Sequence, residues 1–81
     1  MIWVTAAKAL PQHRLWARFS DGAEGEVDLN DFVQRDSRAI VQALRDPSLF
    51  AALRVDLDTI VWPNGFDLAP ERLRSMLKAT G

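Results

Sequence analysis

The 81-residue chain carries a formal net charge of −1, contains no cysteine, and is 48% hydrophobic and 26% charged, which fits one folded domain over residues 1–81. The lack of cysteine excludes disulfides and thiolate metal sites, and the lack of a basic surplus disfavours a protein that binds nucleic acid on its own. Because no apolar run is long enough to cross a bilayer, and the N-terminus lacks the basic and apolar segments of a secretory signal, we expect no membrane helix and no secretory signal.

The first third of the chain alternates apolar and polar residues, a pattern typical of strands with one buried face. We predict strands over residues 2–10, 14–19 and 24–29, with Pro11 ending the first. Paired in order, they make a three-stranded antiparallel meander. In the first strand we expect Ile2, Val4 and Ala6 on one face and Trp3, Thr5 and Ala7 on the other.

The turn between the second and third strands determines how they pair. A two-residue loop of Asp21 and Gly22 would place charged residues opposite apolar ones, whereas a three-residue loop over 20–22 keeps each face uniform. The longer loop is a type I turn followed by a bulge, with Gly22 in the left-handed conformation. We therefore expect three facing pairs, which are Leu15 with Val27, Arg18 with Glu24, and Arg14 with Asp28.

Beyond residue 29 the apolar spacing becomes that of helices. We predict a short helical turn there, with Asp28 or Asn30 as its cap, and a second amphipathic helix near residues 37–44. The side chains expected to form the apolar stripes are Leu29, Phe32, Val33, Ile40, Val41 and Leu44.

The last part of the chain mixes short helices and strands. Asp46 before a proline predicts the N-cap of a helix over residues 47–53, two short strands follow at 54–57 and 59–62, and a final helix covers 70–79. This order predicts an α+β fold, in which a small antiparallel sheet, the meander plus the late strand pair, has three to four short helices packed on one face. The last helix is expected to turn Leu73, Met76 and Leu77 inward.

Side chains suited to catalysis are sparse. The one histidine, His13, could act as a general base, but no residue near it in sequence would orient it, so we favour a polar loop residue. Asp56 and Asp58 could form a weak cation site or a solvated edge, and we favour the edge. No lysine follows the hairpin glycines as a phosphate loop requires. We expect no enzyme, no catalytic residue, no cofactor and no metal.

The outward face of the predicted hairpin is the first candidate site. It carries Arg14, Trp16 and Arg18 against three carboxylates of the next strand. A tryptophan between arginines is typical of protein interfaces and also of base-stacking platforms. A third interpretation is a ladder of ion pairs with the indole lying over aliphatic stems. Because the carboxylates would repel phosphate, these three residues are candidates for binding a protein.

The segment from Ile60 to Leu68 is the second candidate site. Asn64 before Gly65 favours positive φ, and Asp67 can accept backbone N–H groups ahead of the final helix. The segment would then be a tight corner, with Trp62 covering the core. The alternative is a surface loop that presents Asn64 and Asp67 to a ligand or partner.

Several segments are informative in combination. They are Arg14-Leu15-Trp16, Phe19-Ser20-Asp21-Gly22, Glu24-Gly25-Glu26-Val27-Asp28-Leu29, Leu44-Arg45-Asp46-Pro47 with Phe50, and Val61-Trp62-Pro63-Asn64-Gly65 with Asp67-Leu68. Together they resemble the bacterial domain of unknown function 2442 family over nearly the whole chain. The resemblance implies a small α+β fold in the bacterial cytoplasm without known catalytic residues. It also implies a frequent neighbour, a second small protein, in an arrangement similar to toxin–antitoxin pairs.

Some longer members of that family carry a C-terminal helix-turn-helix domain that residues 1–81 lack, so operator binding by this chain alone is not expected. The favoured hypothesis is a protein-binding module, the antitoxin-like half of a pair with a neighbouring-gene product. One alternative is an orphan structural protein that forms a homodimer, since a small core could use a symmetric edge contact. Another is a nucleic-acid-binding accessory protein.

Overall fold

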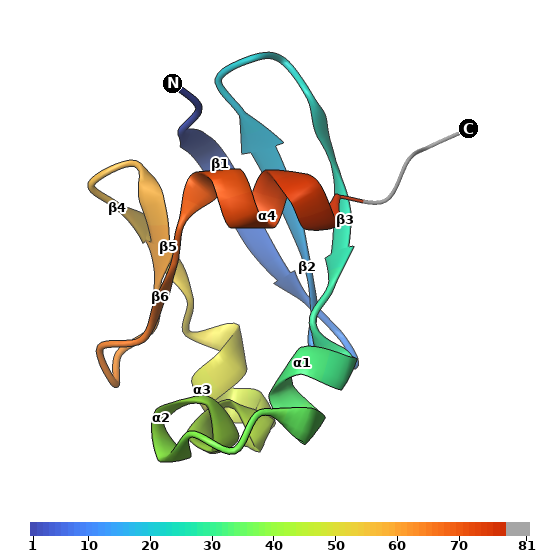
Figure 1. Ribbon diagram of the computed structural model, residues 1–81, viewed down its shortest axis with the longest axis vertical. Helices are drawn as coiled ribbons and strands as arrows, with labels where there is room; N and C mark the ends of the chain where they lie inside the picture. The colour runs from blue at the N-terminus through green and yellow to red at the C-terminus, as the bar shows by residue number, and fades with distance from the viewer. Residues whose placement is uncertain (78–81) are drawn as a thin grey trace.

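The computed structural model describes residues 1–77 and confirms the predicted α+β class. Its elements are β1 (Val4–Leu10), β2 (Arg14–Phe19), β3 (Glu24–Asp28), α1 (Asn30–Arg35), α2 (Ala39–Gln42), the 3-10 turn η1 (Ala43–Arg45), α3 (Pro47–Ala51), β4 (Arg54–Asp56), β5 (Thr59–Val61), β6 (Asp67–Leu68) and α4 (Pro70–Met76). The strands form two antiparallel sheets, ordered β1-β2-β3 and β4-β5-β6. Figure 1 shows α4 crossing in front of the first sheet and the other helices gathered at one end of the strands.

The hairpin of β2 and β3 pairs as its turn chemistry predicts. All three expected facing pairs are present, Leu15–Val27, Arg18–Glu24 and Arg14–Asp28. The Phe19 N–H donates to the Ala23 carbonyl at 2.8 Å to close the loop, and Gly22 has a φ of +87°. A side chain at that φ would be strained, so glycine is suited to this turn position.

The first strand departs from the prediction near its start. Its pairing with β2 shifts by one residue between Val4 and Ala6, which is a β-bulge. Val4 is buried, and beyond the bulge Ala7 packs against the core. The prediction that Ala6 shares the face of Val4 is therefore wrong, because the extra residue reverses the alternation. Lys8 consequently lies on the outward face.

The helical end of the molecule confirms one predicted cap and corrects one predicted stripe. Asp46 Oδ1 accepts the Ser48 N–H at 3.0 Å at the start of α3, as expected. The predicted helix over 37–44 is split between α2 and η1, and Ile40 is 39% exposed rather than inward. A short helical segment such as α2 with η1 can bury only a narrow strip of its side chains against the core. Val41 and Leu44 are the buried residues of this strip.

The second sheet contains the predicted strand pair, β4 and β5, and a third strand that the sequence did not indicate. This strand, β6, has two residues, and Leu68 pairs with Ile60 of β5. The helix predicted over 70–79 ends at Met76, and residues 78 and 79 lie outside the described residues. Leu73 of α4 is buried, and Met76 and Leu77 pack against the core as predicted.

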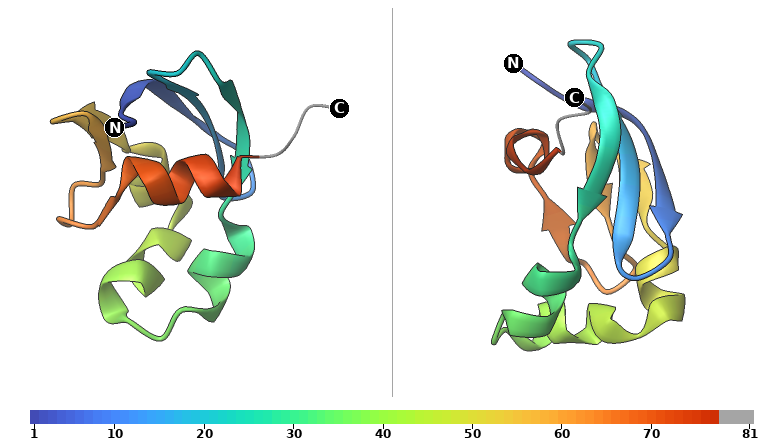
Figure 2. Two further views of the ribbon diagram at one scale, coloured as in Figure 1. Left: turned by 45° about the horizontal axis from the view of Figure 1, so that its top comes forward. Right: turned by 90° about the vertical axis from the view of Figure 1, so that its right-hand side faces the viewer.

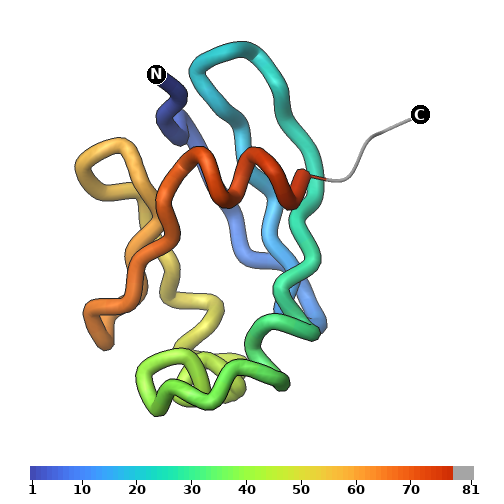
Figure 3. Tube along the Cα trace, viewed as in Figure 1, coloured from blue at the N-terminus to red at the C-terminus, as the bar shows by residue number. Residues whose placement is uncertain are grey.

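The core joins both sheets and the helices. Trp62 is its largest fully buried side chain, and the indole N–H donates to the Phe50 carbonyl at 3.0 Å. Figure 3 shows the start of the chain beside the β4–β5 turn, where the Val4 N–H donates to the Asp58 carbonyl at 2.9 Å. Within residues 1–77, no helix is long and apolar enough to cross a membrane.

Candidate functional site

The outward side of the first sheet is the first candidate site, and we call it the open face. Leu15, Ala17 and Phe19 are buried, so the alternate residues of β2 point away from the core. The open face consists of Ala6, Lys8, Leu10, Arg14, Trp16, Arg18, Glu24, Glu26 and Asp28. Figure 2 (right view) shows α4 on the other side of this sheet and no helix of residues 1–77 lying over the open face.

Charge is segregated across the open face. Its cations, Lys8, Arg14 and Arg18, lie on β1 and β2, and its carboxylates, Glu24, Glu26 and Asp28, lie on β3. The central row runs from Lys8 through Trp16 to Glu26, because Trp16 pairs with both. Trp16 thus has an arginine two residues before it and another two residues after it on its own strand, Lys8 on one neighbouring strand and the carboxylates on the other.

Ion pairs hold the arginines of the open face in place. The Arg18 Nε donates to Glu24 Oε2 at 2.6 Å, and Arg14 forms an ion pair with Glu26, on the neighbouring row. The Arg18 guanidinium also lies 5.5 Å from the ring centroid of half-buried Trp16, within cation–π range. The ion-pair ladder considered from the sequence is therefore present for both arginines.

Lys8 is a residue of this face that sequence reasoning missed. Simple alternation from the start of the strand would turn it to the core, and only the bulge after Val4 turns it outward. A lone lysine among alanines in a strand was the available signal, because burying an unpaired ammonium group is costly.

Asn64 and Asp67 are not brought together with the tryptophan and arginines of the open face. The Asn64 side chain donates to the Ile40 carbonyl at 2.9 Å and accepts the Phe66 N–H at 3.2 Å, so it joins the corner to α2. It is Gly65, with a φ of +91°, that takes the left-handed conformation. These contacts support the interpretation of this segment as a tight corner.

The cap predicted for Asp67 is wrong. The N-cap of α4 is Ala69, with no side-chain cap hydrogen bond, and Asp67 pairs with Val61 in β6. Asp67 lies in β6, two residues before the N-cap Ala69, because its backbone pairs with β5. The residue is exposed there.

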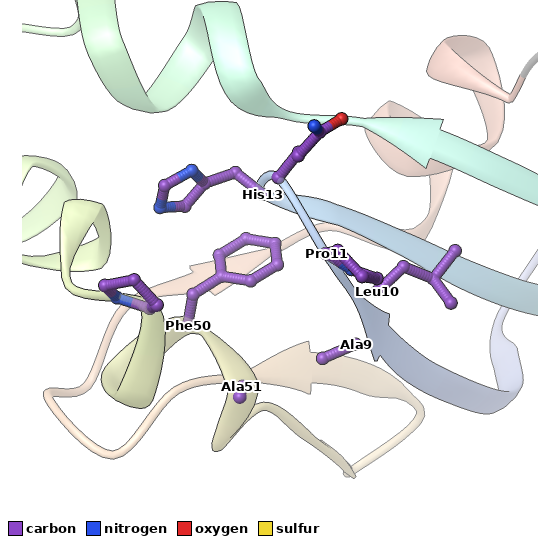
Figure 4. Close-up of a pocket in the computed structure, with 8 residues that line it drawn as sticks. Ala9, Leu10, Pro11, His13, Phe50 and Ala51 are labelled. Carbon is purple, nitrogen blue, oxygen red and sulfur yellow. The ribbon is translucent and has the colours of Figure 1, made fainter.

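A hollow of about 400 Å³ lies between the β1–β2 turn and α3 (Figure 4). The His13 and Phe50 rings meet edge to face there, with centroids 5.2 Å apart. The His13 Nε2 lies 3.0 Å from the Arg45 carbonyl, an acceptor, so this nitrogen carries the proton and donates. The residues lining the hollow are Ala9, Leu10, Pro11, Gln12, His13, Pro47, Phe50 and Ala51.

The turn that carries this histidine is strained. Gln12 and His13 have φ values of 65° and 56°, a conformation that costs non-glycine residues energy. The Leu29 N–H donates to the His13 carbonyl at 2.9 Å, which helps to hold the bend. His13 thus joins the first sheet to the helical end, which the sequence did not reveal.

One perturbed acid lies at the helical end, beside the corner. The hydrogen bonds from Arg38, first the side chain and then the backbone N–H, lower the pKa of Asp36 to about 2. The same guanidinium lies 5.7 Å from the ring centroid of Phe66, and Arg72 lies 5.5 Å from that of Phe32, which stacks on Phe66. The two arginines and two phenylalanines thus form a cluster next to Trp62, which Phe66 contacts.

Over residues 1–77, the structure contains no group of three metal-ligating side chains of the His, Asp or Glu type. Asp56, considered above as a cation ligand, pairs instead with Arg54 at 3.6 Å.

Comparisons with known proteins agree with the fold. The structure resembles a crystal structure from Nitrosomonas europaea, named "Putative DNA Binding Protein", with a TM-score of 0.71 and 21% identity. The alignment covers 96% of this chain and 50% of that one, so this chain spans half the length of the protein it matches. At this identity the likeness shows the fold alone. No curated protein matches the chain.

A family profile also matches most of the chain. The profile described as "Protein of unknown function (DUF2442)" matches residues 4–78, which include both sheets and all the described helices. The resemblance seen in the sequence is thus confirmed at the level of the family, and the chain belongs to the DUF2442 family of proteins of unknown function.

Proposed function

We propose that this chain is a non-catalytic protein-interaction module of the bacterial cytoplasm and that its open face is the docking surface. The contact residues are Arg14, Trp16 and Arg18 from β2, with Lys8 beside them on β1. The proposed setting is the antitoxin-like half of a pair, in which the partner is a neighbouring-gene product. That setting rests on the family resemblance.

The observation that supports docking is the environment of Trp16. The ring sits at the centre of the open face, half-buried, with charges of both signs around it. Tryptophan and arginine are the residues most often found as energetic anchors of protein interfaces. Arg14 and Arg18 lie on the same strand as the ring, and the Arg18 guanidinium is 5.5 Å from the ring centroid, so arginine and tryptophan are presented together.

The contacts of His13 support the non-catalytic part of the proposal. One ring nitrogen is engaged by the Arg45 carbonyl, and the ring packs on Phe50. These contacts give the imidazole a structural role between the sheet and the helices, and the proposal assigns it no catalytic one.

Co-expression with the neighbouring-gene product, followed by calorimetry of the purified pair, tests the proposal. Trp16→Ala should weaken the complex by about 2 kcal/mol or more. Leu57→Ala is the control, because this side chain is 92% exposed in the turn between β4 and β5 and is not part of the open face. Equal weakening by both variants would remove the open face as the docking surface. No complex at micromolar concentration, and no rescue of a growth defect caused by the neighbour, would remove the antitoxin-like pairing.

Nucleic-acid binding is a second candidate, and it rests on the name of the Nitrosomonas europaea protein. Half of that protein lies outside the match, and the carboxylates of β3 here oppose phosphate binding. A gel shift at low salt tests this candidate. Binding that weakens steeply with added salt would support it, and no shift would dismiss it.

A further inference from the structure

The third strand of the first sheet, β3, has an outer edge with which no other strand of residues 1–77 pairs. The order β1-β2-β3 places β1 and β3 at the two edges of the sheet, and Figure 1 shows β3 on the side away from the second sheet. The β1 edge is covered, because β1 contacts β4 and α3. An uncovered strand edge can accept another strand through its backbone groups.

The hairpin register determines which backbone groups lie on the outer edge of β3. At the loop end, the Phe19 N–H donates to the Ala23 carbonyl at 2.8 Å, and hydrogen-bonded pairs recur at every second residue of an antiparallel ladder. The odd-numbered residues of β3 therefore bond to β2. The N–H and C=O groups of Glu24 and Glu26 point away from β2, and none of these four groups has a hydrogen-bond partner within residues 1–77. They are the donors and acceptors that a fourth strand needs.

The side chains beside this edge indicate the charge of the strand that fits it. The outward side chains of β3 are all carboxylates, those of Glu24, Glu26 and Asp28. Arg18 binds Glu24 through Oε2, and Arg14 binds Glu26 through Oε1. The second carboxylate oxygen of each glutamate has no hydrogen-bond partner among the described residues, so it can accept from a lysine or arginine on an added strand.

The same carboxylates disfavour a second copy of this chain at the edge. Two β3 strands paired antiparallel about a twofold axis would place the carboxylates of one copy opposite those of the other. Like charges directly opposite each other destabilise a strand pair, whereas opposite charges stabilise it. The occupant that fits is therefore a strand of a different protein, with basic side chains at alternate positions.

We infer that the partner protein adds an extended segment to β3 as a fourth strand, with lysine or arginine at alternate positions beside Glu24 and Glu26. The inference rests on the proposed function in one respect, that this chain binds a protein, and it adds how that protein is held. In strand addition to a sheet edge, backbone hydrogen bonds give affinity and alternate side chains give specificity. The basic side chains of the added strand would extend the open face beyond β3.

A short synthetic peptide in which lysine alternates with valine tests the inference, with the whole chain as its target. Amide hydrogen exchange is followed by NMR. In the free chain, the amides of Glu24 and Glu26 should exchange rapidly, whereas those of Gly25 and Val27 should be protected by their bonds to β2. Saturation with the peptide should slow exchange at Glu24 and Glu26 by at least about tenfold and leave the other two amides unchanged.

Two variants separate backbone pairing from charge. Glu26→Pro removes one outward N–H, and proline is tolerated at an edge-strand position whose N–H faces solvent. It should weaken peptide binding by about tenfold, because a backbone hydrogen bond is lost. Glu26→Thr keeps the N–H and loses the carboxylate, so it should weaken binding by only about threefold. Thermal melts establish that each variant is folded, and the exchange measurement on the wild type stands without them if Glu26→Pro unfolds.

The matched control peptide has glutamate in place of each lysine. It can form the same backbone bonds but places carboxylates beside carboxylates, so it should bind at least about tenfold more weakly. Four results would overturn the inference: amides of Glu24 and Glu26 that are already protected in the free chain, no slowing at saturation, equal binding of the acidic peptide, or unchanged binding by folded Glu26→Pro.

The same variants, tested on the complex with the neighbouring-gene product, separate this inference from the proposed function. If Trp16→Ala weakens that complex and folded Glu26→Pro does not, the open face remains the docking surface and strand addition is removed. If Glu26→Pro weakens it and Trp16→Ala does not, strand addition stands and the open face is removed.

Discussion

Trp62 and Trp16 are the same residue type in opposite circumstances. Trp62 is 1% exposed, packs between Phe50 and Phe66 with ring centroids 5.8 and 5.7 Å away, and donates its indole N–H to a backbone carbonyl. Trp16 lies half-buried on the open face, under the guanidinium of Arg18. The first ring is held by the interior of the protein, and the second is only partly covered by its own neighbours.

The difference separates stability from recognition in this small protein. A buried ring with a satisfied N–H contributes free energy of folding through its apolar area and its packing. A ring on an uncovered sheet face contributes less to folding and leaves apolar area available for a partner. We therefore expect substitutions at the two positions to act on different measurements.

The largest effect is expected at the corner. Trp62→Ala should lower the free energy of unfolding by about 3–5 kcal/mol, because it opens a cavity and leaves the Phe50 carbonyl without its donor. Thermal and urea melts measure this. Trp62→Phe, which keeps a ring but loses the N–H, should lose clearly less. A loss below that of Trp16→Ala would mean that the faces of the sheets are assigned wrongly.

The next largest loss of stability is expected at Asn64, and it tests whether the corner formed by residues 60–68 has a structural role. Asn64→Ala removes the donor to the Ile40 carbonyl and the acceptor of the Phe66 N–H, and should cost about 1–2 kcal/mol in chemical denaturation. Asn64→Asp keeps the acceptor alone and should fall between alanine and wild type. Unchanged stability with weakened partner binding would return Asn64 to the set of docking residues.

A smaller loss is expected on the open face. Trp16→Ala should cost about 1 kcal/mol or less in a thermal melt, as surface substitutions usually do, while it weakens partner binding. Trp16→Phe should retain most of both quantities. A variant that unfolds outright would show that this ring is part of the core, which would break the contrast with Trp62.

The smallest effect concerns pH. The hydrogen bonds from Arg38 hold the pKa of Asp36 at about 2 in the folded chain, below the ordinary value of 3.8. The folded state therefore gains stability from the ionised carboxylate above about pH 4, and this gain is lost as the pH falls toward 2. Melts of wild type and Asp36→Asn between about pH 5 and about pH 2 should converge at the acid end. Parallel curves would show that this acid does not contribute.

The hairpin of β2 and β3 is the part of the fold that sequence reasoning predicted in full. Its register follows from the alternation of Leu15, Ala17 and Phe19 and from a turn in which Gly22 adopts positive φ. Both signals lie within a few residues of the contacts that they specify. The Asp46 cap of α3 is local in the same way, and it was also predicted.

The errors involve pairing and packing that neither turn residues nor an alternating pattern signals in the sequence. The bulge after Val4 fits β1 to β2, the exposure of Ile40 reflects which side of α2 meets the core, and β6 exists because Leu68 pairs with Ile60. Asp67 lost its predicted cap to that same pairing. For the candidate site, the sequence placed Arg14, Trp16 and Arg18 together on one face, and the bulge added Lys8.

The sequence by itself determined the family, the α+β class, the hairpin register and the tryptophan between two arginines, because each depends on local periodicity and turn chemistry. Tertiary structure decided that Asn64 ties the corner to α2 and that His13 ties the first sheet to η1. It also decided that a bulge turns Lys8 onto the open face. The contacts of Asn64 and His13 depend on which backbone carbonyl of another segment lies next to each side chain. Such hydrogen bonds produce no periodic pattern in the sequence, so the sequence alone does not predict them.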